Sequence, residues 1–305
     1  MRYQLLLIAS LFAVSISAQE PEQPVEKPKP DPYVPQPQDI VIGEQLETLL
    51  PASEVKWLGD GDNRYLARSK TAETGQAMGN ILLLPGPGKT INSAGYVRQA
   101  MAYYPTVSWH TMAIPAGPLD FSGPEVEIPE TTKPVAQDAA EAPTDGAEPD
   151  TKPPKPEPVL KPEGAWYDAQ QKANMALITA RVKQASEQLP ESQKGYVVIT
   201  ASASAGLLVS AIAAGDINPK ALVILDIEHP VRTHQDKMMA DLAALSIPIL
   251  DLYQPLNEAA AKKRQPLARK ANYRQTMIPT VSADYVGVED LLQRTIRGWL
   301  KVHTN

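Results

Sequence analysis

The stretch of this chain that could carry chemistry is residues 195–208, which read GYVVITASASAGLL. The apolar, β-branched first half predicts a buried strand, and the apolar residues that follow recur at helical spacing. A serine at a sharp turn from a strand into a helix, with small residues two positions before and after it, is typical of a nucleophilic serine. We therefore take Ser204, flanked by Ser202 and Gly206, as the candidate nucleophile. The alternative is a tight turn without chemistry, because small residues also let a helix pack closely on a strand.

The elements that must position this serine form an alternating pattern. Apolar strands are predicted at 81–84, 109–114, 196–200, 221–225, 248–253 and 273–278, and helices at 40–50, 93–104, 167–189, 233–245, 257–271 and 288–302. The runs 55–58 and 64–67 flank a turn-rich link and predict an N-terminal antiparallel hairpin. This alternation predicts an α/β fold with a mostly parallel central sheet and helices on both faces. The last helix places Trp299 on its apolar face, so we expect that side chain to be buried.

The N-terminal region has the composition of a targeting segment. Residues 1–18 combine Arg2, an apolar run at 5–14 and small residues before Ala18, which predicts a signal peptide cut after Ala18. An uncleaved membrane anchor is the alternative. Residues 19–39 contain seven prolines in 21 positions and predict a disordered leader. No later stretch is long enough to span a bilayer.

Residues 120–164 interrupt the domain that we place at 40–305. They contain ten prolines, and 11 acidic residues against four lysines, a net charge of −7. This composition predicts a disordered, proline-rich and acidic insertion, with a lid or a partner-binding tether as the alternative. Because the whole chain carries −6, this segment accounts for its acidity and nothing favours nucleic-acid binding. The chain has no cysteine, which excludes disulfides, thiol catalysis and cysteine-ligated metal.

Four motifs occur in the order found in α/β-hydrolases: ILLLPGPG at 81–88, the serine turn, IPILDL at 247–252 and GVEDLLQRTIRGWL at 287–300. The chain resembles this superfamily over about residues 40–119 and 165–305. More narrowly, it is similar to an uncharacterised family of secreted α/β-hydrolase-like proteins of Gram-negative bacteria, domain of unknown function 3530. The resemblance implies a single α/β-hydrolase-like domain, secreted to the periplasm. We expect no cofactor, no metal and no membrane span after signal cleavage.

Catalysis in that superfamily needs a serine, a histidine base, an acid that orients the base, and two amide donors for the oxyanion. The resemblance implies that Ser204 is the serine and that the amide of Ala205 is one donor. The second donor normally follows a His-Gly pair, but this chain has Pro-Gly-Pro-Gly at 85–88. Proline has no N–H group, so only Gly86 and Gly88 remain as donors in this loop.

The missing histidine is the larger departure from that superfamily. The loop in which it would lie, 279–287, reads PTVSADYVG. His229 follows the strand next to the serine turn and is the one candidate base, with Asp226, Glu228 or Asp251 as the acid. The other histidines are expected in a strand (His110), on a helix surface (His234) and in solvent near the C-terminus (His303).

We therefore expect a non-catalytic periplasmic protein, with a small molecule or an envelope protein as its ligand. The alternative is a serine esterase or acyl hydrolase in which Ser204 uses a rearranged base such as His229. A third interpretation, an envelope interaction protein that acts through the insertion, differs from the first in the surface that binds. The distance from the serine hydroxyl to the nearest imidazole separates the first two, because a base must lie within hydrogen-bond reach.

Overall fold

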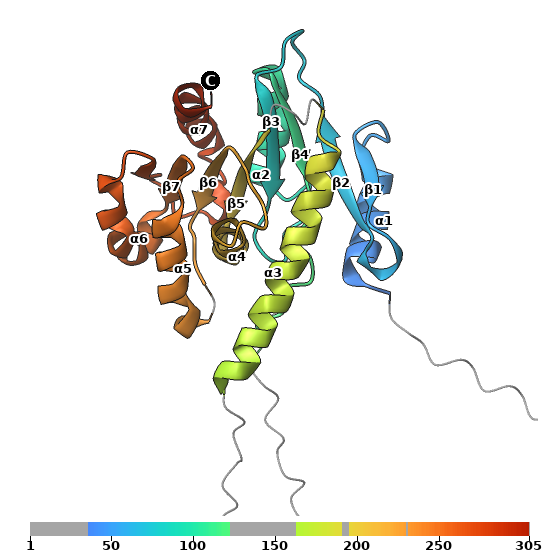
Figure 1. Cartoon of the computed structure of the whole chain (residues 1–305). Helices are drawn as coiled ribbons and strands as arrows, with labels where there is room; N and C mark the ends of the chain where they lie inside the picture. Colours follow the sequence, from blue (N-terminus) through green and yellow to red (C-terminus); the bar gives the residue numbers. More distant parts are fainter. Residues whose placement is uncertain (1–35, 123–162, 191–194, 230, 305) are drawn as a thin grey trace, which may run out of the picture. The chain divides into compact units, whose positions relative to one another are not determined.

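A single sheet organises the chain in the computed structural model. Its strands are β1 (Val55–Leu58), β2 (Tyr65–Lys70), β3 (Gly79–Leu84), β4 (Trp109–Ala113), β5 (Tyr196–Ala201), β6 (Ala221–Leu225), β7 (Ile249–Tyr253) and β8 (Tyr273–Met277). They lie in the order β1-β2-β4-β3-β5-β6-β7-β8 (Figure 1). β1 pairs antiparallel with β2, and β2 with β4, while all other pairs are parallel. The predicted hairpin and the mostly parallel sheet are both confirmed.

The structure describes residues 36–122, 163–190, 195–229 and 231–304. The predicted signal peptide, most of the predicted leader and most of the predicted insertion lie outside these residues. The ends of that insertion, however, belong to the fold. The Asp120 amide donates to Asn174 Oδ1 at 3.2 Å, and Asn174 Nδ2 donates to the Asp120 carbonyl at 2.6 Å. The Phe121 side chain packs on the core. Of the predicted insertion, at about 120–164, the structure describes only 120–122 and 163–164, and a helix begins at Glu163.

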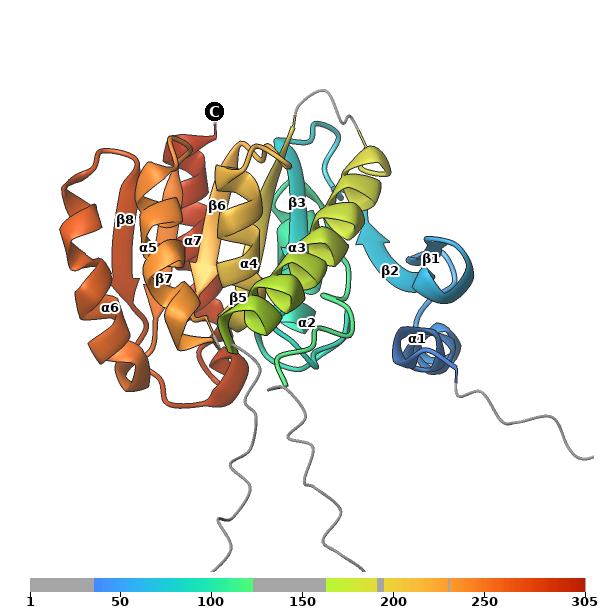
Figure 2. The ribbon, with the colours of Figure 1, turned by 60° about the horizontal axis from the view of Figure 1, so that its bottom comes forward.

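Helices cover both faces of the sheet. They are α1 (Gln38–Leu49), α2 (Tyr96–Thr106), α3 (Glu163–Glu187), α4 (Ser202–Ala213), α5 (Arg232–Ala244), α6 (Glu258–Arg264) and α7 (Glu289–His303), with short 3-10 turns at Gly61–Asn63, Pro255–Asn257, Gln265–Arg269 and Ala283–Tyr285. Helices α3, α4 and α5 pack on one face of the sheet through one apolar layer, and α2 and α7 pack on the other face through a second (Figure 2). Within the described ranges, no helix combines the length and the apolar character needed to cross a membrane.

The central strands sit between these two layers. All six residues of β3 and all five of β6 are buried, because each strand is covered on both faces. That is why their sequences read as unbroken apolar runs rather than alternating ones. Trp299 on α7 is 4% exposed, so its predicted burial is confirmed. The carboxyl ends of the parallel strands all meet at one edge of the sheet.

Candidate functional site

Strained backbone gathers at the carboxyl edge of the sheet. Four residues other than glycine have positive φ there: Ser202 after β5 (55°), Asp226 after β6 (48°), and Asp284 (56°) and Tyr285 (61°) after β8. Such conformations cost about 1–3 kcal/mol each and persist only where the surrounding structure enforces them. Because this kind of strain collects at functional sites, this edge is the candidate site.

The turn from β5 into α4 is made by Ser202 and not by Ser204. β5 runs to Ala201, so the helix begins two residues before the serine that we expected at the turn. Ser204 is 0% exposed in the first turn of α4, and its Oγ has no hydrogen-bond partner among the described residues. The residue after the turn is therefore Ala203 instead of Ala205. Its amide lies in the first helical turn, where backbone N–H groups have no partner within the helix.

The hydroxyl of Ser202 is paired with a carboxylate. Ser202 Oγ donates to Oε1 of Glu228, an exposed residue in the loop after β6. A backbone bond of 3.4 Å from the Glu228 amide to the Ser202 carbonyl joins the same two loops. Gly206 makes this approach possible, since a Cβ there would lie 2.5 Å from the Glu228 carbonyl oxygen. The sequence indicated Glu228 only as an acid for His229 and not as the partner of a serine.

The loop after β3 packs against the same serine. A Cβ on Gly86 would lie 3.3 Å from Ser202 Cβ. Residues 86–89 form a turn closed by a 3.2 Å bond from the Lys89 amide to the Gly86 carbonyl, with Pro87 second and Gly88 (φ 72°) third. That arrangement is typical of a type II turn. Because Pro87 has no N–H and the turn uses that of Lys89, the donors left in the loop are Gly86 and Gly88, and their role stays a prediction.

No hydrogen bond joins His229, the candidate base, to Ser202 or Ser204. This histidine is 5% exposed, its Nδ1 lies 3.0 Å from the Val231 carbonyl oxygen and 3.1 Å from the Val231 amide, and its Nε2 has no partner among the described residues. Its ring meets that of His234 edge-on, at 5.2 Å between centroids. Burial lowers the pKa of His229, the Val231 backbone opposes this, and His234 adds to it. The ring lines a small pocket together with Tyr167 and Asn174 of α3, and no hydrogen bond joins it to Ser202.

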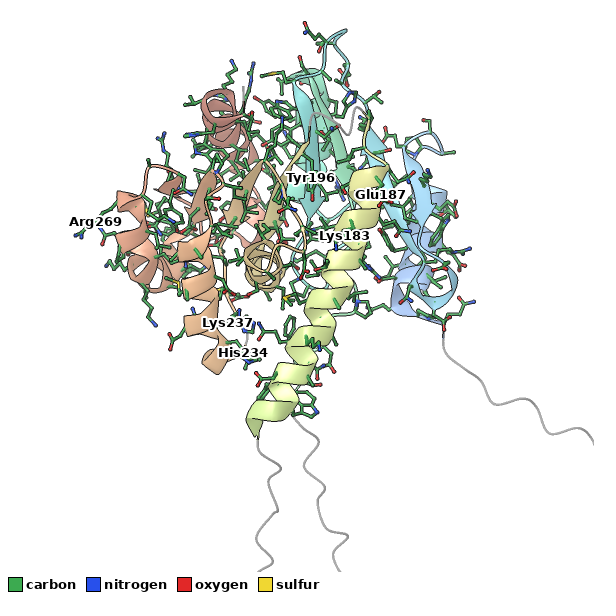
Figure 3. The ribbon with its side chains drawn as sticks, in the orientation of Figure 1. Lys183, Glu187, Tyr196, His234, Lys237 and Arg269 are labelled. Atoms are coloured by element: carbon green, nitrogen blue, oxygen red, sulfur yellow. The ribbon has the colours of Figure 1, made fainter. Side chains whose placement is uncertain are left out.

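The other histidines also lie away from the serine. His234, which we expected on a helix surface, is only 8% exposed and lies next to α3 (Figure 3), and its Nε2 pairs with Asp168 of α3 at 2.7 Å. His110 Nδ1 accepts the Ala72 amide at 3.1 Å, and the His303 ring packs on Trp299. Within the described ranges, no imidazole is therefore hydrogen-bonded to Ser202.

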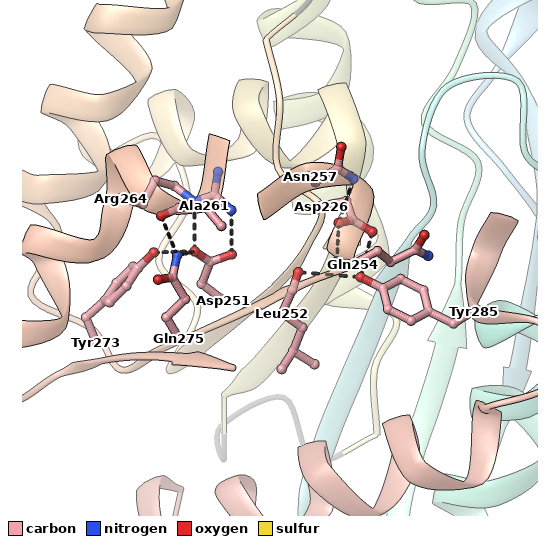
Figure 4. A network of polar contacts seen from close by, with 10 residues as sticks. All are labelled: Asp226, Asp251, Leu252, Gln254, Asn257, Ala261, Arg264, Tyr273, Gln275 and Tyr285. Atoms are coloured by element: carbon pink, nitrogen blue, oxygen red, sulfur yellow. Dashed lines mark hydrogen bonds and ion pairs between the residues drawn. The ribbon is translucent and has the colours of Figure 1, made fainter. Parts of the chain in front are cut away.

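Asp226 stands at the end of β6 and joins three loops. Its Oδ1 accepts the Gln254 amide at 2.8 Å and Asn257 Nδ2 at 2.7 Å, and its Oδ2 accepts Tyr285 Oη at 2.7 Å (Figure 4). We call these four residues the Asp226 clamp. Burial, and then the charge of Asp226, raise the pKa of Tyr285, so this hydroxyl stays protonated and donates. The candidate acid therefore orients a tyrosine in the loop where the superfamily carries its histidine.

Asp251 lies inside β7 and has a different set of partners. Arg264 Nε and Nη2 bind its two oxygens at 2.7 and 3.1 Å, while Tyr273 Oη and Gln275 Nε2 donate to Oδ2 at 2.5 and 2.9 Å (Figure 4). We call these four residues the Asp251 cluster. Both Asp251 and Arg264 are buried. This carboxylate is therefore enclosed by its own partners and has no histidine to orient.

The loop after β8 is fixed at several points. Besides Tyr285 in the clamp, Gln254 Nε2 donates to the Ser282 carbonyl at 3.0 Å and Lys89 Nζ pairs with Asp284 Oδ2 at 2.5 Å. Gly95, at the start of α2, gives the loop room, since a Cβ there would lie 2.1 Å from the Asp284 carbonyl oxygen. These contacts hold the two strained residues of the loop and tie it to the loop after β3.

Comparison with known proteins identifies the family. The chain belongs to the family described as a protein of unknown function (DUF3530), which matches residues 3–302. Its structure is similar to Est1E from Butyrivibrio proteoclasticus, with a TM-score of 0.54 and 8% identity over 82% of this chain and 98% of that one. It is also similar to a dienelactone hydrolase from Anabaena variabilis, with a TM-score of 0.50 and 13% identity over 82% and 99%. No curated protein sequence matches the chain.

At these identities the likeness establishes the fold alone. The chain has an α/β-hydrolase fold, as the sequence predicted, and its family is the one that the sequence resembled.

Proposed function

We propose that this α/β-hydrolase-fold protein binds a ligand without hydrolysing it. The observation that carries the proposal is that the turn serine, Ser202, donates to the carboxylate of Glu228, while no imidazole in the described part of the chain reaches it. A serine hydrolase needs a base that takes the serine proton and then returns it to the leaving group. Carboxylates as a class are weaker bases than imidazole. General-base help is worth about 10²–10⁴-fold in rate, so this site lacks a large share of the usual acceleration.

The surroundings of the serine support the same proposal. Asp226, which stands where an acid could orient a base, has both oxygens bound by neutral donors of the clamp. The loop after β8, in which the superfamily carries its histidine, contributes Tyr285 to the clamp instead. A serine without an activating base is a weak nucleophile.

A second candidate function is a serine esterase that uses Ser202 and Glu228. The hydrogen bond between the two side chains favours it, because a nucleophile and its base must lie within such reach. The amide of Ala203 and those of Gly86 and Gly88 are the available donors for an oxyanion. We do not propose a pairing of Ser204 with His229, since no hydrogen bond joins their side chains.

Ester hydrolysis by matched variants tests both functions. We expect 4-nitrophenyl acetate and butyrate to be hydrolysed no faster by the wild-type protein than by Ser202→Ala or Glu228→Gln. Ser204→Ala is the matched control, because it removes a buried hydroxyl without a partner two residues from the turn. A wild-type rate that is kept in Ser204→Ala but lost in both Ser202→Ala and Glu228→Gln would reject the binding function and establish the esterase.

We also propose secretion to the periplasm, supported by the composition of residues 1–18. The mature protein is then expected to begin at Gln19. Mass spectrometry of the protein from a periplasmic extract measures this directly, and an intact chain that starts at Met1 would contradict it.

A further inference from the structure

A pocket lies next to the turn between β5 and α4, and Ser202 does not line it. It has a volume of ≈ 210 Å³ and is bounded by α1, β2 and the loops after β3 and β4. Its apolar walls include Ile42, Leu46, Leu66, Ile91, Pro115 and Leu119. Neither Ser202, Glu228 nor any member of the Asp226 clamp lines it. It nevertheless shares Pro87 and Gly88 with the turn whose Gly86 packs on Ser202.

The two charged residues that line this pocket are already neutralised. Asp39 Oδ2 pairs with Arg181 Nη2 at 2.5 Å, and the Arg181 side chain is buried and also donates to the Pro115 carbonyl. Lys89 Nζ, at the other side, pairs with Asp284. A charged ligand would have to displace one of these partners or be buried without a counter-ion, and both are unfavourable. An uncharged ligand avoids both penalties.

The size of the pocket limits the ligand. A dry cavity of about 150 Å³ lined by leucine, isoleucine and phenylalanine binds benzene. The present pocket is larger and has polar groups at its border, so it can hold a substituted aromatic ring or a short alkyl chain with one uncharged polar end. Ligand sites in proteins commonly combine mainly apolar walls with a few polar groups of this kind.

We propose that this pocket is the ligand site of the protein, and that its ligand is an uncharged, mainly apolar small molecule such as a small aromatic or short-chain ester or alcohol. The proposal rests on the binding function proposed above and adds the place and the ligand class. It also explains why a site next to the serine turn can be used without the serine: the ligand touches the Pro87–Gly88 side of the turn, and Ser202 lies on the Gly86 side.

Titration with two matched pairs of probes tests the ligand class. The pairs are ethyl benzoate with benzoate, and hexyl acetate with hexanoate, followed by amide resonances in ¹⁵N-labelled full-length protein. We expect the neutral probes to shift the amides of Gly43, Gly88 and Gly117 saturably, and the anions to bind at least tenfold more weakly. Anions that bind more tightly, with binding lost in Lys89→Met, would overturn the uncharged ligand. The absence of saturable shifts with all four probes would overturn the site.

Variants that fill the pocket test its location. Ile42→Trp should weaken binding of ethyl benzoate at least tenfold, whereas Leu49→Trp should leave it unchanged, because Leu49 is on the same helix but 74% exposed and outside the pocket. Leu119→Trp fills the opposite wall and serves where α1 does not tolerate the change. Unchanged binding in a folded filling variant, as judged by its thermal midpoint, would overturn the location.

Product analysis of ethyl benzoate incubated with the wild-type protein and with Ser202→Ala separates failure of this inference from failure of the proposed function. Formation of benzoate and ethanol in the wild-type sample, but not in Ser202→Ala, would reject the binding function and leave the pocket as a substrate site. Loss of binding in Ile42→Trp without any product in either sample would support both proposals.

Discussion

Two carboxylates at neighbouring strands, Asp251 fully buried and Asp226 partly buried, serve different purposes. Asp251, within β7, is held by a bidentate arginine together with Tyr273 and Gln275. Asp226, at the end of β6, has no cation in its hydrogen-bond shell and is held by the backbone of Gln254 and the side chains of Asn257 and Tyr285. A tyrosine hydroxyl donates to each carboxylate. In the Asp251 cluster the negative charge is neutralised by Arg264, whereas in the Asp226 clamp it is stabilised by neutral donors.

This difference shows how the fold employs its two candidate acids. The Asp251 cluster joins β7, β8 and α6 within the packed core, where a charge requires a counter-ion. Burial alone would lower the pKa of Arg264, but its hydrogen bonds to Asp251 and the charge of that carboxylate raise the pKa above its ordinary value. The Asp226 clamp instead fixes the loops after β6, β7 and β8, in which three of the strained residues lie. Stability and positioning of the site are thus assigned to separate carboxylates.

The largest effect is expected from removal of the cation of the Asp251 cluster. Arg264→Met leaves Asp251 buried without its counter-ion, which typically costs about 3–5 kcal/mol in the free energy of unfolding. The double variant Asp251→Leu/Arg264→Met should recover much of this loss, because an apolar pair can replace a buried ion pair. Urea unfolding measures both. A loss below about 1 kcal/mol in Arg264→Met would show that the arginine does not neutralise Asp251.

Matched tyrosine variants sharpen the comparison. Tyr285→Phe removes one of three donors to Asp226, and hydrogen bonds to charged groups contribute about 1.5–3 kcal/mol. Tyr273→Phe removes the corresponding donor from Asp251, which keeps its arginine and Gln275, so its cost should be smaller. Tyr285→Phe should also speed hydrogen exchange in the loop after β8, and Tyr273→Phe should not. The opposite order of unfolding free energies would contradict the distinction between clamp and cluster.

The fold was predictable because its central strands leave a clear pattern in the sequence. β3, β5 and β6 are covered on both faces and read as continuous apolar runs, and Trp299 lies on an apolar helical face. The serine at the turn was not predictable from composition, since the small-residue pattern favours Ser204, whereas Ser202 has the β-branched Thr200 two positions before it. The choice depends on where β5 ends, and that is set by the pairing of Ala201 with Leu225 of β6.

The hydrogen-bonded side-chain pairs of the site could not be predicted from the sequence for a related reason. Ser202 and Glu228 are 26 residues apart, and Asp226 and Tyr285 are 59 residues apart. Each pair meets only because the parallel strands bring their carboxyl ends to one edge of the sheet. His234 gave no sign of burial in its own helix, because α3 covers it and provides Asp168. Side-chain pairs of this kind follow from the assembled sheet and not from local sequence patterns.

The smallest effect is expected from His229, in the loop that begins at Asp226. Its pKa is lowered by burial, so between the folded value and the ordinary value of about 6.5 the unfolded chain binds more protons than the folded one. Stability should therefore decrease as the pH falls through about 6.5 towards the folded pKa, and His229 should contribute no pH dependence above that window. The groups that face the ring are His234, which is itself paired with Asp168, and the backbone of Val231.

His229→Gln tests this assignment, because it removes the titrating group and keeps a polar side chain. Free energies of unfolding at pH 7 and pH 5 should differ less in His229→Gln than in the wild-type protein. An equal difference in the two proteins would show that His229 does not titrate in this window. If the amides of Glu228 and His229 in the wild-type protein also have lower protection factors at pH 5, protonation loosens the loop that carries the partner of Ser202. The Asp251 cluster, whose arginine stays charged at both values of pH, should show no such change.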